Sequence, residues 1–193
     1  MGEAHPPVKR RRFDLSRKKT LIFAAALFLL GAIVLLYPSF SNLVNRLHGS
    51  YAISEIRQKM EKTDASVVAA QRNDAQYYNN LLKRGEKPDN YDRVLNISNG
   101  MMGFIRIPSI RVNLPIYHGV EEDVLTKGVG HMPETSLPIG GEGNHAVLTG
   151  HTGLPSAKLF TDLTELSEGD SFSIHVLDDV LNYEIDQIKV VLR

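Results

Sequence analysis

Residues 143–163 read GNHAVLTGHTGLPSAKLFTDL and carry the strongest structural signals in the sequence. It opens with a short apolar run over residues 145–149, which predicts a buried strand. Gly150 and Gly153 then flank His151, and this spacing favours a sharp turn that holds the imidazole clear of the backbone. The stretch therefore predicts a strand that delivers a histidine at its end.

The same stretch continues into a short helical pattern over residues 157–163, which follows Pro155 and Ser156. A histidine fixed at the end of a strand suits proton transfer, because its ordinary pKa of about 6.5 lies close to working pH. The plainer interpretation is that His151 only fills a turn. Composition by itself does not separate these two interpretations.

Three segments carry a resemblance to a known family. Residues 149–163 (TGHTGLPSAKLFTDL) resemble the histidine segment of the sortases, the cysteine transpeptidases of Gram-positive cell surfaces. Residues 103–119 (GFIRIPSIRVNLPIYHG) resemble the first two strands of the sortase barrel, and residues 124–141 (VLTKGVGHMPETSLPIGG) resemble the segment that follows them. Together they are similar to class C sortases, the pilin-polymerising group. The resemblance implies that His151 is the catalytic histidine.

Two further motifs of the family are expected but not found. The resemblance calls for a cysteine in a TLxTC motif and a later arginine, whereas this sequence contains no cysteine and its last residue is Arg193. We therefore expect the chain to correspond to the amino-terminal portion of a sortase. We also expect it to be inactive as given.

The chemistry implied by the resemblance needs no cofactor. A cysteine thiolate attacks an LPxTG-type sorting signal, and an amine on the next pilin or on a cell-wall precursor resolves the acyl-enzyme. His151 would protonate the leaving amine, and the arginine would stabilise the oxyanion. The expected partners are therefore pilins and other sorting-signal proteins. Ser156 and Thr149 lie near His151 in sequence, but a serine nucleophile also needs an oriented base and an oxyanion hole.

The other histidines do not indicate a metal site. His145 and His151 would sit at opposite ends of one strand, some 20 Å apart at about 3.3 Å per residue, so they would not share one ion. His118, His131 and His175 are expected to be loop or strand-surface residues. The sequence thus predicts no metal centre.

Residues 20–37 (TLIFAAALFLLGAIVLLY) predict a membrane anchor, since they carry no charge over 18 residues and would span roughly 27 Å as a helix. Residues 1–19 hold seven basic and two acidic residues, which predicts a cytoplasmic tail with everything after Pro38 outside the cell. A cleaved signal peptide, with Ser39 and Ser41 near the cleavage point, is the main alternative, and a buried core helix is the other.

The overall charge excludes some function classes. The chain has 22 basic and 22 acidic residues, and beyond residue 19 there are 15 basic against 20 acidic residues. Such a remainder is a poor nucleic-acid binder, because phosphate contacts need clustered Lys and Arg. An exported chain without cysteine also has no disulfide framework, so its fold depends on its apolar core.

Residues 38–92 are expected to form a helical arm and a linker. A second helix would start at a cap on Asp64 or Ser66 and present Tyr77 and Tyr78 on its packing face. Residues 83–92 have the composition of a linker. Class C sortases commonly carry an Asp-Pro-aromatic lid motif in this neighbourhood, and the nearest equivalent here is Asp89-Asn90-Tyr91. A lid and a plain tether both remain open.

The remainder, residues 93–193, is expected to be a mainly β domain. Residues 102–107 and 112–117 predict two strands joined by a turn, residues 121–127 one or two helical turns, and residues 137–144 a loop. Further strands are predicted at residues 171–176 and, by alternation of apolar and polar residues, at residues 181–191. The resemblance makes this a sortase-like β-barrel with about six of its eight strands.

Two functions follow from these patterns. The first is a membrane-anchored sortase, single-pass, with its domain outside the cell, acting in pilus assembly or cell-wall anchoring. The second is a non-catalytic, membrane-anchored surface interaction module that keeps a sortase-like fold. The nucleophile separates the two, because only the first function requires a thiol.

Overall fold

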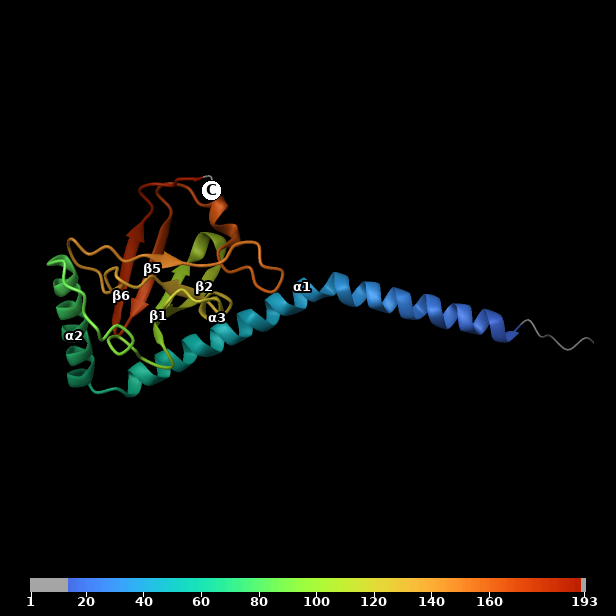
Figure 1. The fold of residues 1–193 in the computed structure, drawn as a ribbon, viewed down its shortest axis with the longest axis horizontal. Helices are drawn as coiled ribbons and strands as arrows, with labels where there is room; N and C mark the ends of the chain where they lie inside the picture. Colours follow the sequence, from blue (N-terminus) through green and yellow to red (C-terminus); the bar gives the residue numbers. More distant parts are fainter. Residues whose placement is uncertain (1–13, 192–193) are drawn as a thin grey trace, which may run out of the picture.

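The computed structural model describes residues 14–191, with side chains from residue 17 on. The N-terminal half of a long helix extends away from the rest of the molecule. The remainder of the chain folds against the C-terminal half of that helix (Figure 1). Most of the expected basic tail, residues 1–19, lies outside the described residues.

Helix α1 runs without interruption from Asp14 to Lys62. An 18-residue window of α1 is apolar enough to cross a membrane, and none of that window is buried in the fold. Pro38 lies inside the helix, where it removes one backbone hydrogen bond to the carbonyl of Val34. The apolar segment and the first part of the arm are therefore one continuous helix, whereas the sequence pattern predicts two separate segments.

The second half of α1 packs on the domain. Ile53 and Ile56 are buried, and the guanidinium of Arg57 lies 5.0 Å from the centre of the Phe104 ring. The hydroxyl of Ser98 donates to the Glu55 carboxylate at 2.6 Å. These contacts fix the orientation of α1 relative to the sheet.

Helix α2, Ala65–Lys83, begins after an N-cap at Asp64, which is one of the two predicted caps. The two tyrosines of α2 differ in exposure, since Tyr78 is buried and Tyr77 is 63% exposed. The buried Asn79 side chain donates to the Leu137 carbonyl at 3.1 Å and accepts from the Leu137 N–H at 2.7 Å. This pair of bonds ties α2 to the 137–144 loop.

The centre of the sheet is a hairpin. Strand β1, Met101–Ile107, and strand β2, Val112–His118, pair antiparallel through the 3₁₀ turn η1, Pro108–Ile110, as predicted. Strand β5, Ser171–Val176, pairs with the other edge of β1, and β6, Asp179–Glu184, pairs with β5. The strand β5 has the predicted bounds.

The other half of the sheet begins after helix α3, Glu122–Leu125, which matches the expected helical turns. Strand β3, Val129–His131, runs parallel to β2, and β4, Leu148–Thr149, pairs antiparallel with β3. The order is β4-β3-β2-β1-β5-β6, a six-stranded sheet curled into a half-barrel. The predicted mainly β fold with about six strands is confirmed, although β3 itself is not predicted by the sequence.

Three expected elements are wrong in extent. The strand predicted at residues 145–149 is reduced to β4, because the backbone of residues 145–147 bonds to the irregular turn before it. The His145 carbonyl accepts from the Ser136 N–H at 3.0 Å, and the Val147 N–H donates to the Thr135 hydroxyl at 3.2 Å. Side chains and turn backbone replace a regular ladder there.

The helix predicted at residues 157–163 is also wrong. Leu154 and Ala157 form an isolated bridge, and Leu159 has φ 38°, outside the right-handed helical region. Only a 3₁₀ helix, η2 at Thr161–Glu165, follows.

The strand predicted at residues 181–191 ends at Glu184, where the partner strand begins with Ser171. The Ile185 N–H still reaches the Asp170 carbonyl at 2.9 Å. Beyond it, no strand pairs with residues 186–191 among the residues that the structure describes, and Val190 is 89% exposed.

Candidate functional site

The predicted site histidine lies directly beyond the outermost strand. His151 follows β4 and Gly150, and a Cβ added at Gly150 would lie 2.8 Å from the Phe160 ring. A side chain at position 150 would therefore displace that ring, which accounts for the glycine. The turn that the sequence predicts at His151 is thus present, and a close approach to Phe160 explains its first glycine.

The loop after His151 is closed by its own hydrogen bonds. The Phe160 N–H donates to the His151 carbonyl at 3.1 Å, and the Gly153 N–H donates to the Thr161 hydroxyl at 2.9 Å. Gly153 has φ 72°, which a glycine adopts at low cost. Within the loop, the side chains of Ala157, Leu159 and Phe160 are buried. The backbone that carries His151 is therefore fixed at both ends.

Helix α1 also holds this loop. The Asn45 amide donates to the Ser156 carbonyl at 2.7 Å, and the Lys158 N–H donates to the Asn42 side-chain oxygen at 3.1 Å. Both asparagines lie only a few residues beyond the apolar half of α1. The loop next to the candidate histidine is thus in direct contact with the helix that carries the candidate membrane span.

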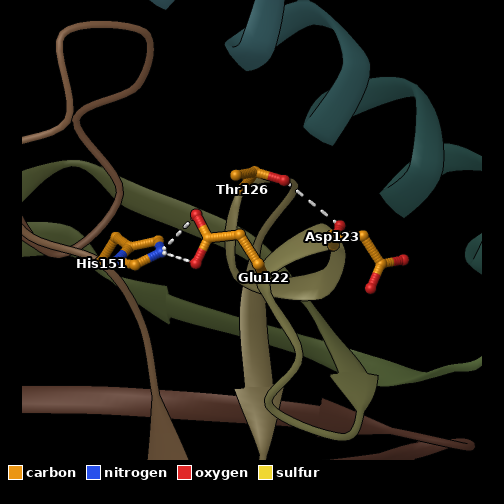
Figure 2. Close-up of polar contacts among 4 residues, drawn as sticks. All are labelled: Glu122, Asp123, Thr126 and His151. Carbon is orange, nitrogen blue, oxygen red and sulfur yellow. Dashed lines mark hydrogen bonds and ion pairs between the residues drawn. The ribbon is translucent and has the colours of Figure 1, made fainter.

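The His151 ring faces a carboxylate. Its Nε2 lies 3.2 Å from each carboxylate oxygen of Glu122, in the first turn of α3, as Figure 2 shows. The His151 side chain is 29% exposed and that of Glu122 is 75% exposed. The pair contributes little to stability at such exposure, but a carboxylate that accepts from Nε2 orients the ring and leaves Nδ1 for another partner.

Glu122 was not singled out from the sequence, because 29 positions separate it from His151. The topology brings them together. Strand β3 follows α3 and pairs antiparallel with β4, so the chain that leaves β4 runs back towards α3. Only the β3–β4 pairing places Glu122 beside His151, and the sequence does not predict β3.

His131 was expected at a surface, and this expectation is wrong. Its side chain is completely buried on β3, and burial lowers its pKa. Its Nε2–H donates to the Ser136 carbonyl at 2.8 Å, so Nδ1 is left as an acceptor. The ring is a neutral core group that secures the turn before the 137–144 loop.

Tyr91 joins that core. Its hydroxyl lies 3.0 Å from His131 Nδ1 and 2.8 Å from the His131 carbonyl, and it accepts from the Gly119 N–H at 3.0 Å. Burial raises the pKa of Tyr91 to about 12. The Tyr91 ring also meets His118 edge-on, with ring centres 4.9 Å apart. Tyr91, the aromatic of the nearest lid-like tripeptide, is therefore an anchor of the linker on the sheet.

The remaining histidines occupy separate places. His118 bridges the Gly100 and Val94 carbonyls at 2.9 Å each, His175 stacks on Phe104 with ring centres 4.3 Å apart, and His145 is exposed. Neither His145 nor His151 belongs to the two-residue strand β4. Within the described residues, no three His, Cys, Asp or Glu side chains gather as a metal site would require.

Comparisons with known proteins point to one family. Residues 105–193 match the sortase domain family. The chain is 36% identical to sortase C1 of Streptococcus agalactiae, covering 72% of this chain and 77% of that one, with a TM-score of 0.69. Sortase C of Clostridium perfringens, solved with its C-terminal cell wall sorting motif, is 42% identical over 72% of this chain and 76% of its own, with a TM-score of 0.67. Sortase D of Bacillus subtilis is 26% identical over 161 residues, which are 82% of this chain and 77% of that protein.

Proposed function

The chain belongs to the sortase family and has the class C type of fold, and from this premise we propose that it is built for cysteine transpeptidation on LPxTG-type sorting signals, with His151 as its proton donor. The observation that carries the proposal is the histidine site itself. His151 lies on a loop fixed at both ends, with a carboxylate against Nε2 and Nδ1 left for a reacting group.

The chemistry assigns His151 one step. A thiolate adds to the carbonyl of the scissile peptide bond, and collapse of the tetrahedral intermediate expels the amine of the next residue. That amine must take up a proton as it leaves, and an imidazolium held at the site supplies it. An incoming amine then attacks the thioester and returns its proton to the imidazole. The substrate class is supported by the C. perfringens relative, whose structure was solved with the C-terminal cell wall sorting motif.

The nucleophile is not among the side chains of this sequence, which has no cysteine. The hydroxyls near His151 do not replace it, since none of the described hydrogen bonds joins Ser156 or Thr149 to the imidazole. We therefore propose that the chain as given forms no thioester and leaves an LPxTG-type peptide uncut.

The test is a chimera in which residue 193 is followed by the cysteine- and arginine-bearing segment of S. agalactiae sortase C1. We expect this chimera to cleave a fluorogenic LPxTG peptide and the His151→Ala form to lose that activity. His145→Ala is the matched control, because His145 is exposed and bonds to the fold only through its backbone. Equal loss in both variants, or an active His151→Ala chimera, would contradict the assignment of His151.

We further propose that α1 anchors the chain, with residues 39–193 outside the cell and the amino terminus in the cytoplasm. The support is the exposed apolar helix and the basic residues that precede it. Protease added to intact protoplasts should remove the folded domain and spare a short anchored peptide. Protection of the whole chain would show the opposite orientation or a location inside the cell.

The missing thiol also supports a second candidate, a non-catalytic anchored module. Such a module would bind a sorting-signal peptide without cutting it. Isothermal titration of the chain with an LPxTG peptide separates the two functions, because the module requires measurable binding by the chain alone. The enzyme proposal requires turnover only once the cysteine-bearing segment is added.

A further inference from the structure

A cavity of about 500 Å³ opens beside α1, outside the histidine site. Its walls are one face of α1, the turn that joins β1 to β2, and the loop that follows His151. Six charged side chains line it, four of them cationic: Arg46, Arg111, Lys127 and Lys158, against Asp162 and Glu165. The cavity is therefore locally basic in a chain whose part beyond residue 19 is net acidic.

Two of the four cations are already paired. Lys127 lies 3.3 Å from the Asp123 carboxylate, and Lys158 lies 3.2 Å from that of Asp162. By contrast, neither Arg46 nor Arg111 takes part in any ion pair between described residues. Two guanidinium groups, which suit a phosphate better than any other cationic side chain, are thus left to a ligand.

The level of the cavity along α1 indicates which ligand reaches it. An apolar stripe continues past the uncharged segment on one face of the helix, at Phe40, Leu43 and Leu47, whose side chains are 67%, 53% and 61% exposed. The stripe continues to Tyr51, which is 73% exposed. Phe40 and Leu43 follow Tyr37 by about 4.5 and 9 Å of helix, so they lie close to the headgroup layer. Exposed apolar side chains at this spacing are expected to lie in the boundary of a bilayer.

Arg46 lies between the levels of Leu43 and Leu47. A helical side chain leans towards the helix N-terminus, so the guanidinium of Arg46 reaches back towards the membrane. Arg111 sits at the tip of the β1–β2 turn in the left-handed conformation, with φ 55°, and lines the same cavity. Both cations therefore lie where the phosphate layer of the outer leaflet would be.

We propose that this cavity binds the phosphate of an anionic phospholipid of the outer leaflet, held between Arg46 and Arg111. The inference rests on the proposed membrane anchor. A lipid is favoured over free phosphate because the anchor keeps headgroups at high local concentration beside the cavity. Each cation near an anionic membrane surface favours binding roughly fivefold.

The experiment uses the full chain in nanodiscs of phosphatidylcholine, with or without phosphatidylglycerol, and reads hydrogen exchange of the backbone amides. We expect phosphatidylglycerol to slow exchange at residues 109–113 and 157–159. The Arg46→Gln/Arg111→Gln chain should lose this protection or need at least tenfold more phosphatidylglycerol. An Arg84→Gln/Arg93→Gln chain, which loses the same charge at exposed positions outside the cavity, should keep it.

Three results would overturn the proposal in distinguishable ways. If the chain does not co-purify with the discs, both the proposed membrane anchor and the proposed lipid site are contradicted. If the chain enters the discs but its amides exchange equally in both lipids, the anchor is supported and the lipid site is contradicted. The same holds if both double variants respond equally to phosphatidylglycerol. If sodium phosphate gives equal protection in phosphatidylcholine discs, at the same total phosphate, the cavity binds a free anion and the lipid proposal is contradicted.

Discussion

Among single residues, Glu122 is the side chain that most directly sets the state of His151. Its carboxylate accepts from Nε2, so the proton of the neutral ring is held on the nitrogen that faces α3. The role we infer for Glu122 is positioning, because Nδ1 is then the nitrogen left to react in the proposed function. This role differs from a structural one, since the pair is too exposed to stabilise the fold appreciably.

We expect Glu122→Gln to shift the tautomer of His151 and to leave the free energy of unfolding within about 0.5 kcal/mol of the original. The tautomer is read from the ¹⁵N chemical shifts of the ring, with His151→Ala used to assign the signals. In the active chimera, kcat should fall more than KM rises. Asp123→Asn, on the same helical turn, is the control and should change neither the tautomer of His151 nor the kinetics of the chimera. A similar tautomer in the Glu122→Gln chain would show that the carboxylate does not orient the ring.

Tyr91 gives a prediction about pH. The pKa of its hydroxyl is raised from 10.0 to about 12 in the fold, mainly by burial. In the unfolded chain the hydroxyl ionises near its ordinary pKa, so the free energy of unfolding is unaffected below pH 10 and falls as the pH rises towards 12. We expect Tyr91→Phe to be less stable at pH 8, because three hydrogen-bond contacts are lost, and to lose part of this alkaline dependence.

The measurement is urea denaturation of both chains in detergent at several pH values between 8 and 12. Tyr51→Phe is the control, since Tyr51 is 73% exposed. Parallel curves for the Tyr91→Phe chain and the original chain across this range would contradict the role of Tyr91 as a buried neutral hydroxyl.

Between elements, the contact of α2 with the 137–144 loop depends on one side chain. Asn79 is buried and satisfies both the N–H and the carbonyl of Leu137. Asn79→Ala leaves the Leu137 N–H without a partner, whereas the Leu137 carbonyl still accepts from the Ile139 N–H at 2.8 Å. We expect the substitution to lower the free energy of unfolding by roughly 1–3 kcal/mol. Asn80→Ala removes an exposed amide one position along α2 and should cost less than about 0.5 kcal/mol. Equal effects of the two substitutions in urea denaturation would contradict the role of the Asn79–Leu137 contact.

Elements with strong local signals could be predicted from the sequence. The β1–β2 hairpin has two apolar runs around a proline turn, and β5 has a turn signal before it, so local pattern was sufficient for both. Strand β3 was missed because it has three residues, one of them Gly130, and gains its structure from pairing on both sides. The alternation over residues 185–191 misled for the opposite reason, because a pattern without a partner strand does not make a strand.

The site could be predicted only in part. The family resemblance singles out His151, whose catalytic role stays a prediction, and the glycines beside it predicted the turn. Glu122, Asn42 and Asn45 were not predicted, because each reaches the His151 loop from an element distant in sequence. His131 was misjudged, since a histidine between Gly130 and Met132 gives no sign of the buried partners that Tyr91 and Ser136 provide.

For the whole molecule, the half-barrel has two edges, formed by β4 and β6. The β4 edge has only two residues, so it offers little to a second chain. The β6 edge has six residues, and among the described residues no strand pairs with its outer side. A row of unpaired N–H and C=O groups of this length is a template for pairing with another chain.

We therefore expect the purified chain in detergent to associate through β6. Val180 is 54% exposed on this strand, and Val180→Lys should reduce the associated fraction several-fold, because a charged side chain on an edge opposes pairing with a second copy. Val67→Lys removes a similarly exposed valine from α2, and it should leave association unchanged if the edge, and not general surface hydrophobicity, is responsible. Light scattering at several chain concentrations measures the effect. An equal decrease in association with the two substitutions would assign the association to general apolar surface. If the chain without either substitution remains monomeric, the β6 edge is protected from pairing.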